Sequence, residues 1–146
     1  MRVYRLCRRR HADLSGIGGT LAAGRWHSSG WLLYAASSRA LAVLEWQVNL
    51  ELELSELPND LVFCCLDIPD NQIEPADQSI ALHDLSATRA HGADWLASNR
   101  SLVLAVPSVV VPAENNLLIN CRHRQMAAVA EPVLEPWQPD ERLVRF

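Results

Sequence analysis

Hydrophobic and polar residues alternate along this 146-residue chain in short segments, which predicts strands and short helices. Strands are expected at 3–7, 31–36, 61–69, 79–85, 101–112, 115–120, 129–136 and 142–146. Helices are expected at 37–50 and 92–99, and loops at 11–24, which contains four glycines, and at 70–78. The elements follow one another without a regular βαβ rhythm. We therefore expect an α+β fold in one domain spanning residues 1–146.

The segment 37–50 carries clear helix signals. Ser37 or Ser38 can act as the N-cap, because a hydroxyl there accepts a hydrogen bond from the first turn. A stripe with the i, i+3, i+4, i+7 spacing predicts the face toward the core, and it consists of Leu41, Leu44, Glu45 and Val48. The Glu45 carboxylate is therefore expected to point inward. The acids that follow alternate with leucines and are expected to face solvent: Glu51, Glu53 and Glu56.

Three polar side chains lie in the most apolar stretch of the chain: Arg25, Tyr34 and Glu45. Burying a guanidinium, a phenol or a carboxylate is costly unless each finds a partner. We interpret the three as walls of a pocket for an anionic, sugar-bearing ligand. The alternative is a buried ion pair between Arg25 and Glu45, with Tyr34 as a core tyrosine whose hydroxyl is bonded.

The formal net charge of −4 conceals an asymmetry along the chain. Residues 1–49 hold seven arginines against two acids, a net +5, whereas residues 50–146 hold six arginines against fifteen acids, a net −9. An anionic ligand is therefore expected near the first third, where Arg25 lies. Lysine is absent, which excludes lysine Schiff-base chemistry and a Walker-type phosphate loop. The arginine-rich N-terminal segment leaves nucleic-acid binding as an alternative hypothesis. The acidic rest of the chain and the lack of interleaved aromatic residues argue against it.

Cysteine spacing and apolar run lengths exclude further classes of protein. The cysteines, which show no Cys-x-x-Cys spacing, are Cys7, Cys64, Cys65 and Cys121. We expect them to be reduced and to bind no zinc. The longest apolar runs fall short of the roughly 20 residues that span a bilayer. The first residues also lack the apolar segment of a secretory signal, so we expect a cytoplasmic protein without a membrane partner.

Several motifs, in this order, resemble the RES domain family. They are Tyr4 with Arg5, the GRW of 24–26, Tyr34 in a short strand, the AxxE of 42–45, the GADWL of 92–96 and the PSVVVPAENNLLIN of 107–120. The family is named for an Arg, a Glu and a Ser, which match Arg25, Glu45 and Ser108. The resemblance covers nearly the whole chain. The sequence departs from the family at Cys121, where proline is common, and this leaves the role of His123 open.

This resemblance implies an enzyme that consumes NAD as its substrate and needs no other cofactor. RES proteins are toxins of bacterial toxin-antitoxin modules, paired with an Xre-type antitoxin that has a helix-turn-helix domain. Their fold is similar to that of ADP-ribosyltransferases. The expected catalytic residues are Glu45, Arg25 and Tyr34. The expected NAD-binding residues are Arg25, Tyr34, Ser108, Asn120, Tyr4 and Arg5.

Each residue has an expected role in breaking the bond between nicotinamide and ribose. A carboxylate at Glu45 would face the positive charge that develops on the ribose, as carboxylates do in glycosidases. Arg25 would hold the pyrophosphate or the nearby ribose, and Tyr34 would flank the nicotinamide with its ring and hydroxyl. Ser108 would bond to the ligand or orient Glu45. Asn120 would satisfy backbone groups at the end of its strand.

Three functions remain open at this point. The first is NAD cleavage with water or phosphate as acceptor, the second is transfer of ADP-ribose to a macromolecule, and the third is non-catalytic binding. Val43 stands two residues before Glu45, so the ExE pair of many protein-modifying transferases is absent, which favours a small acceptor. We expect an antitoxin to cover the cleft. A homodimer through exposed tryptophans such as Trp137 is a further possibility.

Overall fold

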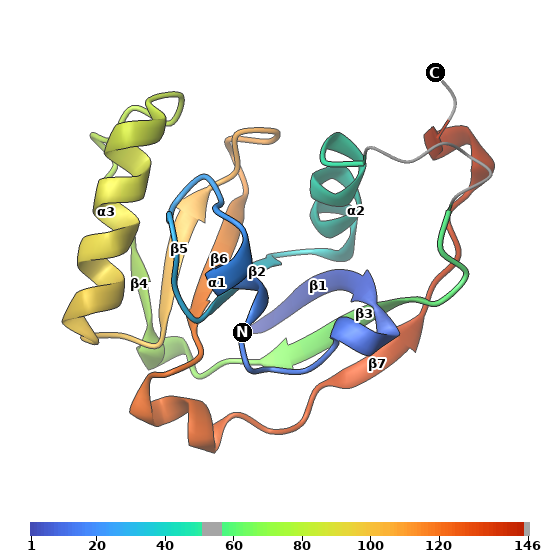
Figure 1. Ribbon diagram of the computed structural model, residues 1–146, viewed down its shortest axis with the longest axis horizontal. Helices are drawn as coiled ribbons and strands as arrows, with labels where there is room; N and C mark the ends of the chain where they lie inside the picture. The colour runs from blue at the N-terminus through green and yellow to red at the C-terminus, as the bar shows by residue number, and fades with distance from the viewer. Residues whose placement is uncertain (51–56, 145–146) are drawn as a thin grey trace.

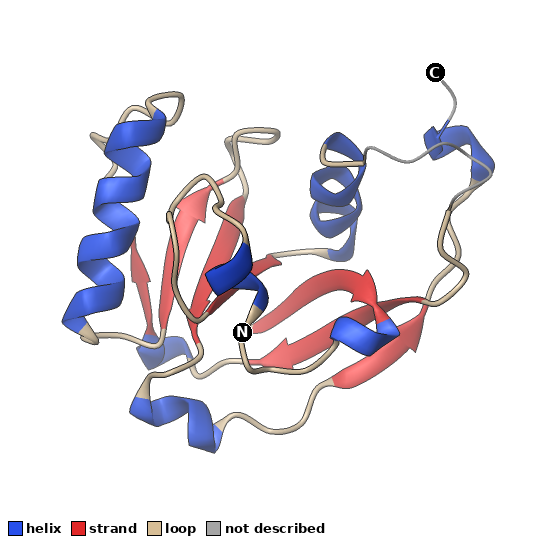
Figure 2. Ribbon diagram, viewed as in Figure 1, coloured by secondary structure: helices blue, strands red, loops and turns tan. Residues whose placement is uncertain are grey.

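The computed structural model describes residues 1–50 and 57–144 and places its strands in one seven-stranded mixed sheet. The strands are β1 (Arg2–Arg8), β2 (Leu32–Ala36), β3 (Leu61–Asp67), β4 (Ile73–Pro75), β5 (Val103–Pro107), β6 (Asn115–Asn120) and β7 (Val133–Pro136). Their order is β4-β5-β6-β2-β1-β3-β7 (Figures 1 and 2). Every neighbouring pair is antiparallel except β4 with β5, which is parallel.

The helices lie beside different parts of this sheet. The α-helices of the described ranges are α1 (Gly18–Leu21), α2 (Arg39–Val48) and α3 (Leu85–Ser98). Short 3₁₀ helices are η1 (Arg9–His11), η3 (Asp70–Gln72), η4 (Arg124–Ala128) and η5 (Glu141–Val144). In Figure 1, α3 runs beside β4 and β5, and α2 stands over the region where β2 and β1 meet. Among the described residues, no helix combines the length and apolarity needed to cross a bilayer. The expected α+β fold is confirmed.

The apolar run of β6 is continuous because both of its faces are buried. Leu117 and Ile119 pack into a cluster with Val3, whereas Leu118 packs on the opposite face with Trp95 of α3. Successive strand residues point to opposite faces, so a strand covered on both sides needs apolar residues throughout. A third cluster joins α2 to the other half of the sheet, and it contains Ala36, Leu41, Ala42, Phe63 and Cys65.

The sheet opens between β1 and β2. β1 pairs with β3 along its whole length, but it pairs with β2 only where Tyr4 faces Ala36. Since Ala36 is the last residue of β2, the rest of β2 diverges from β1, as Figure 2 shows. This divergence leaves side chains of both strands free to line a cavity.

Most strands lie where the sequence pattern predicts them. The expected strands at 3–7, 31–36, 61–69 and 115–120 correspond to β1, β2, β3 and β6. Ser38 is the N-cap of α2, with its Oγ accepting a hydrogen bond from the Leu41 N–H at 3.1 Å, so that prediction is confirmed. The expected strands at 101–112 and 129–136 are shorter than predicted, and β5 ends at Pro107.

Two assignments in the middle of the chain were wrong, and one predicted helix is longer than expected. The predicted strand at 79–85 is a series of turns, because Asp77 accepts hydrogen bonds from the Ser79 N–H and hydroxyl. The predicted loop at 70–78 contains the edge strand β4, which is fixed by parallel pairing with β5. The helix predicted at 92–99 begins earlier, at Leu85, because Asp84 caps it through the Ala87 N–H.

The C-terminal strand predicted at 142–146 is also wrong in its described part. Asp140 accepts a hydrogen bond from the Arg142 N–H at 2.9 Å, which favours the 3₁₀ turn η5. Residues 145–146 lie outside the described residues. The same holds for the solvent-facing acids predicted at 51, 53 and 56.

The inward face of α2 differs from the predicted stripe. Leu41 is buried and Glu45 is half-buried as expected, but Leu44 is 36% exposed and Val48 is 59% exposed. Ala42 takes the place predicted for Leu44 and packs beside Leu41. Val48, at the end of this short helix, borders the cavity and does not enter the core.

Candidate functional site

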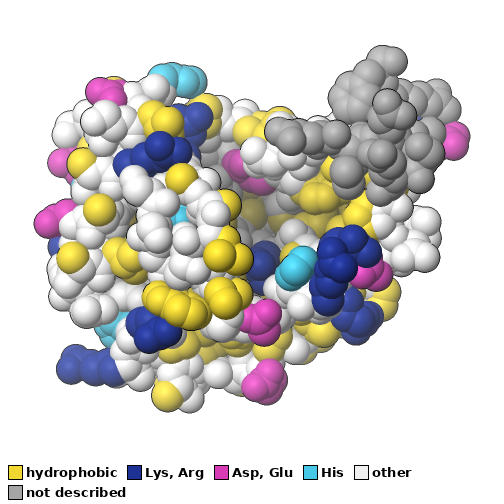
Figure 3. Space-filling model, in the orientation of Figure 1, with side chains coloured by type: hydrophobic (Ala, Val, Ile, Leu, Met, Phe, Trp, Pro, Cys, Tyr) yellow, Lys and Arg dark blue, Asp and Glu magenta, His cyan; other side chains and the backbone are white. Residues whose placement is uncertain are grey.

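A cavity of about 1160 Å³ lies where β1 and β2 diverge. It is lined by both strands, by the glycine-rich segment before β2 and by α2. Figure 3 shows the hollow on this face, with acidic and basic side chains on its walls. Among the described lining residues, Glu45 is the one acid, and four are arginines. The volume exceeds the roughly 300–1,000 Å³ typical of small-molecule sites, so it has room for a large anionic ligand.

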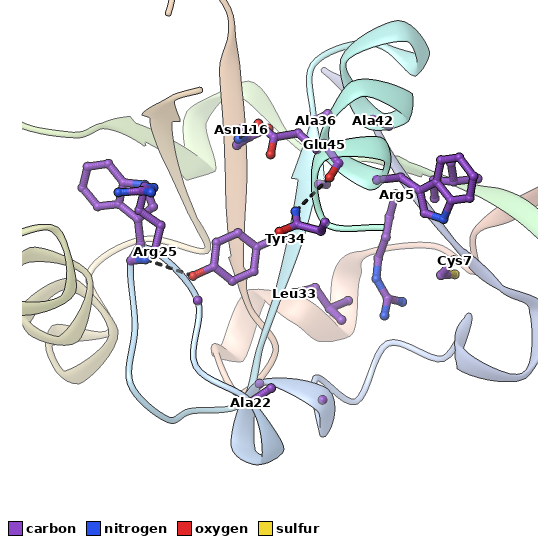
Figure 4. Close-up of a pocket in the computed structure, with 18 of the residues that line it drawn as sticks. Arg5, Cys7, Ala22, Arg25, Leu33, Tyr34, Ala36, Ala42, Glu45 and Asn116 are labelled. Atoms are coloured by element: carbon purple, nitrogen blue, oxygen red, sulfur yellow. Dashed lines mark hydrogen bonds between the residues drawn. The ribbon is translucent and has the colours of Figure 1, made fainter. Parts of the chain in front are cut away.

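Glu45 is held by two hydrogen bonds on one oxygen. Its Oε1 accepts from the Ser108 hydroxyl at 2.7 Å. It also accepts from the Asn116 Nδ2 at 2.8 Å (Figure 4). Its Oε2 has no hydrogen-bond partner among the described residues. The carboxylate is thus fixed at one oxygen, while the other is left for a ligand.

Ser108 is completely buried and follows directly after β5. Its Oγ donates to Glu45 and accepts from the Val110 and Val111 N–H groups, each at 3.1 Å. A serine hydroxyl has one donor and two acceptor lone pairs, so its capacity is fully used here. Of the two predicted roles for Ser108, the structure places it to orient Glu45.

Asn116 is a site residue that the sequence did not reveal. It lies on β6 opposite Ala36 of β2, close to the start of α2. The prediction named Asn120 instead, which pairs with Leu32 at the other end of β2 and does not line the cavity. Asn120 is buried, and its side chain bonds to the Asn99 side chain and the Arg122 N–H. Its predicted bond to a nearby backbone group is present at the Arg122 N–H, whereas the cavity lining does not support its predicted contact with a ligand.

Arg25 lies in a tight turn closed by a bridge between Gly24 and His27. Its Nη1 donates to the Leu82 carbonyl oxygen at 2.9 Å. Within the described residues no carboxylate lies within 4.0 Å of Arg25, so the alternative of a buried Arg25–Glu45 ion pair is wrong. Figure 4 shows Arg25 and Glu45 apart, with Tyr34 between them. Both line the same cavity.

Tyr34 lines the cavity with its ring, but its hydroxyl is already bonded. The hydroxyl lies 3.2 Å from the Trp26 N–H, which donates to it, and 2.7 Å from Nδ1 of His27. Burial raises the pKa of Tyr34 to about 12, so the phenol stays protonated. Tyr34 is one of the residues that line the cavity, whereas its hydroxyl is already occupied by Trp26 and His27, so the predicted use of the hydroxyl is not supported.

His27 is a second residue that the sequence did not single out. It is buried, and its Nε2 lies 3.0 Å from the Gly19 carbonyl oxygen. A carbonyl only accepts, so Nε2 carries the proton and Nδ1 accepts from the Tyr34 hydroxyl in the neutral imidazole. A Cβ at Gly24 would lie 2.4 Å from that hydroxyl, so only glycine fits beside it.

Tyr4 and Arg5 line the cavity from β1, as expected for ligand-binding residues. The Arg39 guanidinium stacks 4.5 Å from the centre of the Tyr4 ring, and Arg5 donates to the His11 carbonyl oxygen at 2.7 Å. His123 lies outside the cavity lining and caps η4 by accepting from the Gln125 N–H.

Trp137, named as a candidate for a dimer contact, is half-buried. Its ring packs edge-on against Trp46, with the ring centres 5.8 Å apart, and at a tilt against Phe63, with the ring centres 5.5 Å apart. The four cysteines are free, and the described residues contain no cluster of three metal-ligating side chains.

Known proteins are similar to this chain in sequence and in fold. The model of the RES domain family matches residues 2–145. A protein named Toxin Res from Pseudomonas putida is 37% identical over 137 residues, which cover 91% of this chain and 94% of that protein. A protein from Sphingobium sp. named Prs ADP-ribosylating toxin is 36% identical over 143 residues, covering 91% of this chain and 88% of that protein.

A solved structure extends the comparison to the fold. A chain in the crystal structure of the M. tuberculosis MbcT-MbcA toxin-antitoxin complex matches with a TM-score of 0.75 at 15% sequence identity. The match covers 94% of this chain and 84% of that one. At this identity the likeness establishes a shared fold. Since the family match spans nearly the whole sequence and relatives exceed 30% identity, the chain belongs to the RES domain family.

Proposed function

We propose that this protein is the toxin of a bacterial toxin-antitoxin module and that it cleaves NAD at the bond between nicotinamide and ribose. The observation that carries the proposal is the Glu45 carboxylate, held at one oxygen by Ser108 and Asn116, in a cavity whose other charged lining side chains are arginines. Relatives named as toxins support the assignment as a toxin.

Glu45 acts on the charge that cleavage creates. When the bond from ribose C1′ to the nicotinamide nitrogen breaks, its electron pair passes to nitrogen, neutral nicotinamide leaves, and the ribose carries the positive charge. A fixed carboxylate facing that charge stabilises the transition state more than the substrate. Attack by an acceptor hydroxyl on C1′ then forms the new bond and releases a proton.

The other residues bind and orient the substrate. Arg25 holds the pyrophosphate or the adjoining ribose through charge-assisted hydrogen bonds. The Tyr34 ring flanks the nicotinamide, and its hydroxyl fixes the Gly24–Trp26 turn that carries Arg25. Tyr4 and Arg5 border the same cavity from β1 and contribute to binding.

Transfer of ADP-ribose to a protein is the second candidate. Apolar side chains at the cavity wall are exposed, which favours contact with a macromolecule: Val48 at 59%, Leu85 at 40% and Val110 at 37%. The Sphingobium relative is named as an ADP-ribosylating toxin. Cleavage is common to both candidates, and they differ only in the acceptor.

The proposed partner is an Xre-type antitoxin with a helix-turn-helix domain, acting in the cytoplasm. A matching chain of known structure comes from a toxin-antitoxin complex, which supports such a partner. The proposed function requires no direct nucleic-acid contact by this chain. Purification with the co-expressed antitoxin, followed by mass measurement of the complex, tests the pairing and reports whether two toxin chains are present.

Nicotinamide release from NAD by the purified protein tests the reaction. Glu45→Gln keeps the side-chain shape and should lower the rate roughly 100- to 1,000-fold, as for loss of one preorganised electrostatic contact. Glu131→Gln is the matched control, because Glu131 is exposed and lies outside the cavity lining. Equal rates for wild type and Glu45→Gln would contradict the proposal. Mass analysis then separates free ADP-ribose, its phosphate ester and a modified protein.

A further inference from the structure

Arg89 of α3 lines the cavity but has no role in the function described above. Its side chain is half-buried, and its Nε donates to the Gly24 carbonyl oxygen at 2.9 Å. In the described part of the chain, no carboxylate lies within 4.0 Å of it, whereas Arg8 on the opposite wall is paired with Asp60. The positive charge of Arg89 is therefore not neutralised by an acid of the described structure.

Helix α3 binds the turn that carries Arg25 through two neighbouring residues, Thr88 and Arg89. Thr88, next to Arg89 in α3, is buried and donates from its hydroxyl to the Arg25 carbonyl oxygen at 2.6 Å. Arg89 binds the preceding residue of the same turn, Gly24. Helix α3 thus fixes the backbone of the turn at two consecutive carbonyl groups, and it brings a second guanidinium to the wall that carries Arg25.

The charge of Arg89 reaches into the cavity. The guanidinium lies close enough to the Tyr34 phenol to oppose the effect of burial on its pKa. A partly desolvated guanidinium without a counter-ion favours an anion, and its planar end suits phosphate oxygens. Its Nε is occupied by Gly24, so the terminal nitrogens Nη1 and Nη2 are the groups left for a ligand.

We infer that Arg89 is a second phosphate-binding residue of this cavity, acting with Arg25 on the pyrophosphate of a dinucleotide. The inference rests on the proposed function, since it names the part of NAD that Arg89 recognises. Arg25 and Arg89 share the two negative charges of the pyrophosphate, while Glu45 on the other side of Tyr34 faces the ribose of the nicotinamide. Arg89 therefore sets affinity for the phosphates and takes no part in bond breaking.

The variant Arg89→Gln separates this role from a structural one. The Gln side chain ends with a nitrogen at the position of the arginine Nε, so it still donates to the Gly24 carbonyl but lacks the charged end. We expect the KM for NAD to rise roughly tenfold to a hundredfold, as for loss of a hydrogen bond to a charged group, with kcat close to that of wild type. For nicotinamide riboside, which has no phosphate, kcat/KM should be unchanged.

Arg124→Gln is the matched control, because Arg124 is exposed in η4 and does not line the cavity. This variant removes the same charge and should leave kcat and KM unchanged for both substrates. If Arg89→Gln lowers kcat/KM equally for NAD and for nicotinamide riboside, Arg89 only holds the turn and the inference is overturned. If Arg89→Gln leaves kcat/KM unchanged for both substrates, the inference is also overturned.

Binding of ADP-ribose and of adenosine tests the inference without catalysis. Calorimetry with wild type and Arg89→Gln should show a loss of affinity for ADP-ribose and none for adenosine. If wild type releases no nicotinamide but this pattern appears, the proposed reaction fails while the phosphate site stands. If the two proteins bind ADP-ribose equally, or wild type does not bind it, the phosphate site is overturned.

Discussion

The Ser108 hydroxyl donates to the Glu45 carboxylate at 2.7 Å while it accepts from two backbone N–H groups, those of Val110 and Val111. Because all three bonding positions of the hydroxyl are used, its proton has one fixed direction. The turn after β5 and the helix α2, 63 residues apart in sequence, are thereby coupled at the carboxylate. Positioning of this kind supports catalysis, since the acid need not reorganise during the reaction.

Ser108→Ala should lower kcat for nicotinamide release roughly tenfold to a hundredfold, because Glu45 loses one of the two bonds that hold it. The KM for NAD should change little, since Ser108 is fully buried. Urea unfolding should also show a loss of about 1–3 kcal/mol, because two backbone N–H groups lose their acceptor. Ser86→Ala, at an exposed position of α3, is the control and should match wild type in both measurements.

Asn116→Asp should shift the acid limb of the activity profile to higher pH. The substitution replaces a donor to Glu45 by a carboxyl group at the same place, and two carboxylates that share a site disfavour joint ionisation. Rates of nicotinamide release between pH 4 and 8 measure the shift. Asn115→Asp adds the same charge at an exposed neighbouring position and should keep the wild-type profile. Coincident profiles for the two variants would show that Asn116 does not govern Glu45.

The sequence could identify Glu45 and Ser108 but not Asn116. Asn116 and Asn120 are four residues apart on β6, so they share a face, and their separation is about 13 Å at the rise of a strand. Which of them lies near α2 depends on the pairing of β6 with β2, where Asn116 faces Ala36 and Asn120 faces Leu32. That register is a long-range property that local patterns do not contain.

Local signals explain the elements that were predicted correctly. The cap at Ser38 and the apolar run of β3 are encoded within a few residues, and both are present. The edge strand β4 is three residues long and exists through parallel pairing with β5, so its own sequence gives no strand pattern. His27 was missed for a similar reason, because its partners Gly19 and Tyr34 are defined only by the fold.

Stability should fall as pH rises above 9, and Cys64 should account for part of the fall. Burial raises the pKa of the Cys64 thiol from 9.0 to about 11. Below pH 9 both the folded and the unfolded chain keep this proton. Between pH 9 and 11 the unfolded chain releases it first, so unfolding becomes more favourable by about 1.4 kcal/mol for each pH unit.

Urea unfolding at pH 8, 9 and 10 measures this slope in wild type and Cys64→Ala. The variant should be less stable at every pH, but its stability should fall less steeply above pH 9. Cys121 has its pKa raised to about 11 by burial as well, so Cys64→Ala retains part of the slope. Parallel curves for wild type and variant would exclude a contribution from Cys64.

Gly92→Ala should destabilise the protein and weaken NAD binding, although alanine is the better helix former. A Cβ at Gly92 of α3 would lie 1.7 Å from the Trp26 carbonyl oxygen, so the helix and the turn before β2 would have to separate. Overpacking of this kind costs about 1–3 kcal/mol or more, and the shift would move the neighbouring Arg25. Thermal unfolding and calorimetry with ADP-ribose measure the two effects. Gly18→Ala is the matched control for thermal unfolding, because a Cβ there meets no atom within 4 Å. A Gly92→Ala protein that melts like Gly18→Ala and binds ADP-ribose like wild type would show that close packing of α3 on this turn does not position Arg25.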